Sequence, residues 1–315
     1  MMKSRRQFMR LTRGAAFLPF LSRLARAETY PSRPVRVLVG FAAGGNFDLV
    51  ARLLGQSLSD RLGQQFVIEN RPGASSNLAT EAAIRASADG YTLLLAGAVN
   101  TINATLLEKL NFDFVRDTAP ISGVVQFSNV MTVGPAFPAK TVPEFIAYAE
   151  ANPDKINHGS SGNGTTQHLA GELFKIMTGI SFTNVPYRGA SQAIAGLLAG
   201  HVQVLFEPLP ASMEQIKSGK LQALAVTTAK RSEALPNVPV VSEFVAGYEA
   251  SGWNGLCAPK NTPVDIVEKL NSAIKASLAD PNMKARFADL GAATIAGSPA
   301  EFGVLIASET ESGRK

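Results

Sequence analysis

A run of small and hydroxylated residues at positions 159–168 has the composition of an anion-binding loop. It reads Gly-Ser-Ser-Gly-Asn-Gly-Thr-Thr-Gln-His. The apolar residues that follow have the spacing of a helix, namely Leu169, Leu173, Ile176 and Met177. Unpaired N–H groups at a helix N-terminus, together with hydroxyl donors, attract a small anion. Because the run contains no Lys or Arg, binding there would rest on hydrogen bonds.

Two further loops offer similar donors. Residues 43–48 read Ala-Gly-Gly-Asn-Phe-Asp between an expected strand and an expected helix, where glycines allow close backbone approach to a carboxylate. A tight turn in which Asp48 only complements the helix dipole explains the same residues equally well. Residues 185–191 contain Tyr187 and Arg188, which could close over an anion through the charged arginine donor. A surface arginine and a packed tyrosine are the alternative there.

Catalytic and metal sites have weaker support. The nucleophile elbow that would pair Ser161 with His168 needs glycine two residues after the serine, and Asn163 stands there. The phosphate loop and the third glycine of the dinucleotide fingerprint are absent from the sequence. His158, His168 and His201 lack metal-ligand spacing. We therefore expect no metal, no cofactor and no enzyme, and a serine hydrolase outside the cytoplasm is a remote alternative.

The elements that must position these loops follow an α/β pattern. Short β-branched runs alternate with helical periodicity, which is typical of α/β layers with mostly parallel strands. Strands are expected at 35–41, 65–70 and 91–97, and helices at 78–87 and after residue 45. In the latter helix, Val50, Leu54, Leu58 and Leu62 form one core-facing stripe.

Three hydroxyl residues, each followed three positions later by an acid, predict helix N-caps at Thr141, Thr262 and Ser298. The single cysteine, Cys257, lies in an apolar context and is expected to be buried and structural.

Two extended segments predict that the chain crosses between two domains. Residues 121–135 contain no strong turn signal, and residues 250–257 form a second candidate crossing. Together they predict one domain of residues 28–128 plus 251–315 and a second domain of residues 129–250. Two such crossings would form a hinge.

The first 27 residues have the features of an export signal. The 315-residue chain has 30 basic and 25 acidic residues, but the leader contains seven of the basic ones and no acid. Without it, 23 basic residues face 25 acidic ones, a net charge of −2, which removes the argument for a nucleic-acid partner. Arg5 and Arg6 are followed by a short apolar run and by Ala25-Arg26-Ala27, which predicts cleavage before Glu28 and a twin-arginine route to the periplasm.

Several ordered motifs together resemble one family. They are Tyr30-Pro31-Ser32-Arg33-Pro34-Val35-Arg36, Gly44-Gly45-x-x-Asp48-x-x-Ala51-Arg52, Asn70-Arg71-Pro72-Gly73-Ala74, Asp89-Gly90-Tyr91-Thr92-Leu93-Leu94, Ser160-Ser161-Gly162-Asn163-Gly164-Thr165, His168-Leu169-Ala170-Gly171-Glu172-Leu173-Phe174 and Val185-Pro186-Tyr187-Arg188-Gly189. From Tyr30 to about Glu309, the sequence resembles the Bug (TctC-like) extracytoplasmic solute receptors of tripartite tricarboxylate transporters.

The resemblance implies a type II periplasmic binding protein, a Venus flytrap of two α/β domains joined by a two-strand hinge. It implies a small carboxylate ligand, held by N–H groups, hydroxyls and waters of the first two loops, and delivery to membrane permease subunits. A receptor that serves a sensor kinase is the alternative. We expect a monomer.

The expected ligand-binding residues are those of the three loops and two further positions. They are Ala43, Gly44, Gly45, Asp48, Thr101, Ser160, Ser161, Gly162, Asn163, Gly164, Thr165, His168, Tyr187, Arg188, Gly189 and Glu207. Specificity is expected from loop positions near Thr101, Glu207 and Trp253. Glu207 has two interpretations: an ordinary exposed glutamate, which is favoured, or an acid beside the cleft that disfavours polyanions and favours an amino or hydroxyl group.

Overall fold

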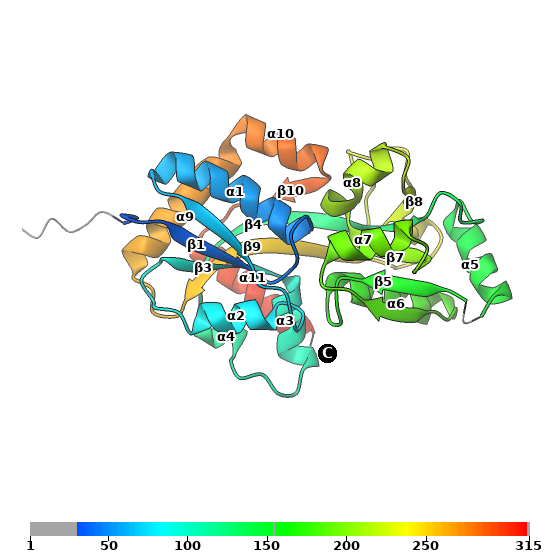
Figure 1. Cartoon of the computed structure of the whole chain (residues 1–315), viewed down its shortest axis with the longest axis horizontal. Coiled ribbons are helices and arrows are strands. Elements are labelled where there is room, and N and C mark those ends of the chain that lie inside the picture. Colours follow the sequence, from blue (N-terminus) through cyan, green and yellow to red (C-terminus); the bar gives the residue numbers. More distant parts are fainter. Residues whose placement is uncertain (1–29, 154, 314–315) are drawn as a thin grey trace, which may run out of the picture.

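The computed structural model describes residues 30–153 and 155–313. The expected export signal, residues 1–27, lies outside the described residues. In the described part, helices and strands alternate from β1 (Val35–Val39) to α11 (Pro299–Ser312), which confirms the α/β class (Figure 1).

The first lobe is built on three parallel strands in the order β2-β1-β3. β2 spans Phe66–Asn70 and β3 spans Thr92–Gly97, while β1 ends two residues before the predicted limit. The helices of this part are α1 (Asn46–Leu62), α2 (Asn77–Ile84), α3 (Ala98–Leu106) and α4 (Phe114–Asp117). The predicted stripe on α1 is confirmed, since Val50, Leu54 and Leu58 are buried.

The second lobe repeats this arrangement. Its strands β5 (Asn157–Ser160), β6 (Thr183–Pro186) and β7 (Val204–Pro208) pair in parallel in the order β7-β5-β6. The helices around them are α5 (Val142–Ala151), α6 (Thr166–Thr178), α7 (Ala190–Leu198) and α8 (Leu209–Lys217). A further strand, β8 (Gln222–Val226), and a short 3₁₀ helix, η1 (Val241–Glu243), complete it.

Strand β4 (Thr118–Val133) joins the two lobes. Up to Ser128 it pairs antiparallel with β9 (Ser251–Pro259), and from Asn129 onward it pairs with β7 and β8. β9 also pairs with β3, so the chain returns to the first lobe after residue 250. Both predicted crossing segments are therefore strands and are antiparallel to each other. Both run along the long axis of the molecule, on which the two lobes lie (Figure 1).

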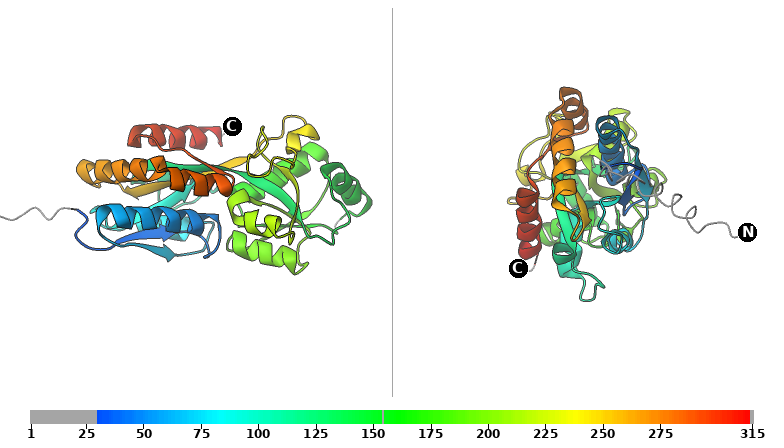
Figure 2. Two further views of the ribbon diagram at one scale, coloured as in Figure 1. Left: turned by 90° about the horizontal axis from the view of Figure 1, so that it is seen from above. Right: turned by 90° about the vertical axis from the view of Figure 1, so that its left-hand side faces the viewer.

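The chain after β9 packs back onto the first lobe. It forms α9 (Val264–Ala279), α10 (Pro281–Asp289), β10 (Ala292–Thr294), which pairs with β4, and α11. Figure 2 shows the lobes side by side along the long axis, with α11 on the outside of the first lobe. The domain limits at residues 128 and 250 stay a prediction.

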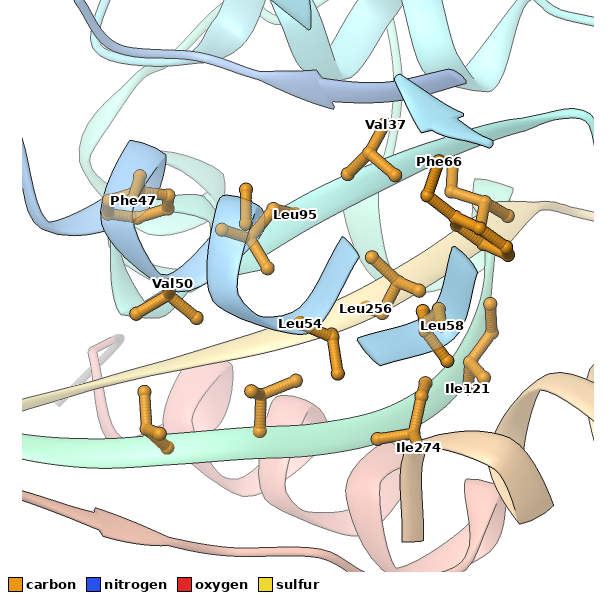
Figure 3. Packing of buried hydrophobic residues seen from close by; sticks show 14 of the residues in the cluster. Val37, Phe47, Val50, Leu54, Leu58, Phe66, Leu95, Ile121, Leu256 and Ile274 are labelled. Carbon is orange, nitrogen blue, oxygen red and sulfur yellow. The ribbon is translucent and has the colours of Figure 1, made fainter. Parts of the chain in front are cut away.

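Each lobe has its own apolar core. In the first, α1, α9 and the strands meet around Leu54, Leu95 and Ile274 (Figure 3). In the second, Phe145, Phe174 and Phe206 pack between α5, α6 and the sheet. Because a fully buried side chain of this size stabilises a fold by about 1.5–3 kcal/mol, each lobe is stabilised by a core of its own.

Two of the three predicted helix caps are confirmed. Thr141 and Ser298 are N-caps whose hydroxyls accept hydrogen bonds from the backbone N–H groups of Glu144 and Glu301. The prediction for Thr262 is wrong, because α9 begins one residue later and the Thr262 hydroxyl donates to the carbonyl of Pro259. Cys257 is buried in β9, as predicted. No helix among the described residues is long and apolar enough to cross a membrane.

Candidate functional site

The predicted loops lie where the parallel strands of each lobe end. The loop 40–45 follows β1, the loop 161–165 follows β5, and residues 187–189 follow β6. Since the carboxyl ends of parallel strands share one edge of the sheet, ligands of α/β proteins bind at such edges. In this chain the edges of the two lobes face each other.

Three hydrogen bonds join the facing loops. The N–H of Ala42 donates to the carbonyl of Arg188 at 3.1 Å, and the Ser191 hydroxyl donates to the carbonyl of Ala43 at 2.9 Å. On the other side, the Ser75 hydroxyl donates to the carbonyl of Asn163 at 2.5 Å. The lobes are therefore closed on each other.

A cavity of about 380 Å³ lies between the closed lobes. Five of the predicted site residues line it, all from the second lobe: Ser161, Gly162, Asn163, Tyr187 and Arg188. This volume falls in the range of small-molecule sites.

The first lobe contributes residues that the sequence analysis did not select. They include Ala74, Ser75, Asn77, Asn103 and Leu107. The motif Asn-Arg-Pro-Gly-Ala at 70–74 pointed to this loop without assigning it a role. Asn103 lies inside α3, and no local signal separates it from an ordinary helical asparagine.

The charge of the cavity wall comes from one residue. Arg188 is the only charged side chain that lines it, and its guanidinium forms no ion pair with any described residue. Ser75, Asn77, Ser161 and Asn163 are among the neutral polar residues of the wall, and the remainder includes glycines and apolar residues such as Phe41 and Leu107. One cation among neutral donors suits a small organic anion, because a guanidinium binds a carboxylate with charge-assisted hydrogen bonds.

The loop 161–165 is held in shape by its own hydrogen bonds. The Thr165 hydroxyl caps α6 and donates to the carbonyl of Gly162 at 2.7 Å. Gly162 and Gly164 have φ angles of 125° and 75°, which favour glycine. His168 Nδ1 accepts from the N–H of Gly164 at 3.3 Å, and burial lowers the pKa of His168. Thr165 and His168 therefore shape the loop, and neither lines the cavity.

The loop 43–48 is organised by Asp48. Its Oδ2 accepts from the N–H of Gly44 and from Arg52 Nε, each at 2.9 Å. Burial alone would raise the pKa of Asp48, but the hydrogen bonds from Arg52 and Gly44 outweigh it and hold this pKa below its usual value. Ala43, Gly44, Gly45 and Asp48 do not line the cavity. This geometry favours the tight-turn interpretation.

Tyr187 and Gly189 shape the third loop. Tyr187 lines the cavity, and its ring packs against α7, where its hydroxyl oxygen lies 2.3 Å from the position a Cβ would take on Gly196. Gly189 has a φ of 153° and caps α7. The position of the ring fits the packed-tyrosine interpretation.

Glu207 is not an exposed glutamate, and the favoured interpretation is wrong. It is the last residue but one of β7, with 0% of its surface exposed. Its Oε2 and Oε1 lie 2.9 Å and 3.2 Å from the Ser161 hydroxyl oxygen. Burial raises the pKa of Glu207 to about 8. The apolar run Val204–Phe206 directly before it was the signal for burial.

The other two specificity positions were also misplaced. Thr101 lies in α3 with its hydroxyl donating to the carbonyl of Ala98 at 2.7 Å, and Trp253 lies in β9. Both are buried, because the crossing strand and the helix directly after β3 fill the space where loops were expected. Ser160 is likewise buried in β5, and its hydroxyl has no partner among the described residues.

Ser161 and His168 do not pair with each other in the structure. Ser161 pairs with the Glu207 carboxyl group, while His168 Nδ1 is occupied by the N–H of Gly164. Among the described residues, no three His, Cys, Asp or Glu side chains come together as a metal site.

Comparison with known proteins decides the family. The model of the tripartite tricarboxylate transporter family receptor, TctC, matches residues 50–314. The chain belongs to the TctC family. Protein BugT of Bordetella pertussis is 35% identical over 290 residues, which cover 90% of this chain and 88% of BugT.

Solved structures of similar proteins share the fold. Rpa4515 of R. palustris, solved with adipate, has a TM-score of 0.88 at 35% identity over 90% of this chain and 95% of its own. MatC of Rhodopseudomonas palustris, with bound malate, has a TM-score of 0.86 at 29% identity over 90% and 99%. The predicted periplasmic-binding fold of two α/β domains is thereby confirmed for this TctC-family chain.

Proposed function

We propose that this TctC-family receptor binds a small organic carboxylate between its lobes in the periplasm and delivers it to a tripartite tricarboxylate-type transporter. The observation that carries the proposal is the cavity between the lobes, with Arg188 as its single charged lining residue. The adipate and malate in the solved structures of the similar proteins Rpa4515 and MatC support the same ligand class.

The carboxylate is proposed to contact residues of both lobes. Ser161, Asn163 and Arg188 offer donors from the second lobe, and Ser75 and Asn77 offer polar groups from the first. A ligand held by both sides stabilises the closed form, because it binds that form better than the open one. The remaining predicted residues of the three loops would act by shaping this cavity.

Delivery requires a partner that distinguishes the closed receptor from the open one. We propose that the permease subunits of the transporter make this distinction and that the receptor acts as a monomer. The leader supports export by the twin-arginine route, since it combines an arginine pair with a short apolar run.

A thermal-shift screen tests the ligand class. The panel comprises mono-, di- and tricarboxylates, aromatic acids, amino acids and the uncharged diamides of adipate and malate. A ligand that binds only the folded protein raises Tm, so we expect carboxylates to raise it and the diamides to leave it unchanged. If no carboxylate raises Tm, or if a diamide raises it equally, the proposal fails.

A further inference from the structure

Glu207 is a buried acid whose side chain has one hydrogen-bonding partner among the described residues, Ser161. It lies within β7, opposite Val130 of β4, and none of its surface is exposed. Both of its carboxyl oxygens are within hydrogen-bond distance of the Ser161 hydroxyl. Ser161 in turn lines the cavity between the lobes. Glu207 is therefore one residue away from the proposed ligand.

Among the described residues, no cationic side chain forms an ion pair with Glu207. The elements that pack against β7 are β4, β5, α6, α7 and α8, and β4 and α7 contain no titratable residue. The titratable residues of the others are His158, His168, Glu172, Lys175, Glu214 and Lys217. None of these six forms an ion pair with Glu207.

The nearby histidines do not change charge above pH 7. Burial lowers the pKa of His158 to about 3 and also lowers that of His168, while Lys175 pairs with Glu172 at 2.9 Å. Across the cavity wall, Arg188 supplies the positive side chain. A change of charge at Glu207 would therefore change the electrostatic energy of an anion bound in the cavity.

The protonation state of Glu207 determines the direction in which the Ser161 hydroxyl hydrogen points. A hydroxyl has one hydrogen to donate and two lone pairs to accept with. When the carboxyl group is neutral, it donates its own hydrogen to Ser161 Oγ, and the Ser161 hydrogen is left for the cavity. When the carboxyl group is ionised, it can only accept, and Ser161 donates to it.

We propose that Glu207 is a proton-bearing positioning residue, which in its neutral form turns the Ser161 hydroxyl toward a carboxylate ligand and in its ionised form withdraws that donor and repels the anion. The assignment rests on the proposed function. It makes ligand binding dependent on a group that does not touch the ligand.

The consequence is a specific pH dependence of affinity. Burial keeps Glu207 neutral at pH 6.5, because its pKa is raised to about 8. If only the neutral form binds, the dissociation constant rises with pH above that value, by about tenfold between pH 6.5 and pH 9. At pH 9 each binding event takes up about one proton.

Calorimetric titration tests the assignment. The probe is adipate or malate, whichever raises Tm more, and Kd is measured at pH 6.5 and pH 9 in two buffers with different ionisation enthalpies. The wild type is expected to lose about tenfold in affinity and to take up a proton at pH 9. The Glu207→Gln variant keeps a donor to Ser161 without titrating, so its Kd should stay constant and its proton uptake should vanish.

Two further variants complete the experiment. Glu214→Gln removes an acid from the exposed surface of neighbouring α8 and is expected to behave as the wild type does. Ser161→Ala removes the donor itself, so it should bind weakly at both pH values and keep only the part of the pH dependence that comes from repulsion by ionised Glu207.

The outcomes separate this assignment from the proposed function. Binding of the probe with equal affinity at both pH values overturns the assignment alone, as does a Glu207→Gln variant with the pH dependence of the wild type. Absence of binding by every carboxylate at either pH overturns the proposed function, and the assignment falls with it.

Discussion

Two buried acids on the cleft side of this chain illustrate how surroundings set the role of a residue. Asp48 accepts hydrogen bonds from Arg52 and from the backbone N–H of Gly44, which keep it ionised and fix the turn after β1. The Glu207 carboxyl group is hydrogen-bonded to the neutral Ser161 hydroxyl, so burial keeps it protonated near neutral pH. The first acid thus stabilises a loop, and the second can respond to pH.

Replacing Asp48 tests its structural role. The Asp48→Asn variant leaves the Gly44 N–H and Arg52 with a weaker acceptor, so the free energy of unfolding at pH 7 should fall by about 1–3 kcal/mol. Because the folded pKa of Asp48 is lowered, its stabilisation is present above the unfolded value of 3.8 and is lost as pH falls through the folded value. Urea unfolding at pH 7 and pH 3 measures the difference, which should shrink at the lower pH.

The control for Asp48 is its partner. Arg52 has a side chain that is 55% exposed, so Arg52→Gln should cost less than about 1 kcal/mol. Equal losses of stability in the two variants would contradict this role. They would mean that Asp48 stabilises the protein only through its ion pair with Arg52, and that its hydrogen bond with the Gly44 N–H adds nothing.

At the scale of elements, the antiparallel pair β4 and β9 is the frame on which both lobes depend. β9 lies against α11, where the ring of Phe302 meets Trp253 edge to face with centroids 5.4 Å apart. Gly255 makes room for this contact, because a Cβ added there would lie 2.1 Å from Phe302 Cζ. The close packing explains why a glycine occurs within a central strand.

Two glycines at this junction should respond with opposite signs to the same change. Gly255→Ala forces Phe302 to move, and overpacking of this kind costs about 1–3 kcal/mol. Gly303 lies in α11, and a Cβ there would meet only Pro120 Cγ at 3.6 Å, so Gly303→Ala should stabilise the protein by about 0.5–1 kcal/mol through helix propensity. Chemical denaturation of both variants measures these changes, and a stabilised Gly255→Ala variant would contradict the packing described.

The sequence predicted the helices and strands better than it predicted which residues come together in the folded protein. Strands, the α1 stripe and both crossings could be predicted, because hydrophobic periodicity is a local property. Ser75 and Asn103 could not be selected, since they reach the cavity only when two lobes far apart in sequence come together. Glu207 was misjudged for a similar reason: a single acid carries no local sign of its depth, although the apolar residues before it do.

At the scale of the whole molecule, closure depends on backbone approach at the facing loops. Gly162 lies at this junction and has a φ of 125°. A Cβ added there would lie 2.9 Å from Ser75 Oγ. Gly200 has a φ of 76° and nothing within 4 Å. The two positions share positive φ and differ in whether the other lobe is nearby.

Alanine variants at Gly162 and Gly200 separate the effect on lobe closure from the effect of backbone strain. Gly162→Ala and Gly200→Ala should each lose stability by about 1–3 kcal/mol through backbone strain. Only Gly162→Ala should also weaken binding of adipate or malate, by about tenfold, which corresponds to about 1.4 kcal/mol. Calorimetric Kd values compare the two, and equal affinities would mean that this loop does not take part in closure.

The central claim is that a carboxylate binds in the cavity between the lobes and pairs with Arg188. The most direct measurement is calorimetric titration, at pH 6.5, of the carboxylate with the largest thermal shift into the wild type and into Arg188→Gln, a substitution at an exposed residue. We expect one site per chain in the wild type and an affinity at least about tenfold lower in the variant, because a charge-assisted pair is lost. Equal affinity in the two proteins would contradict the claim.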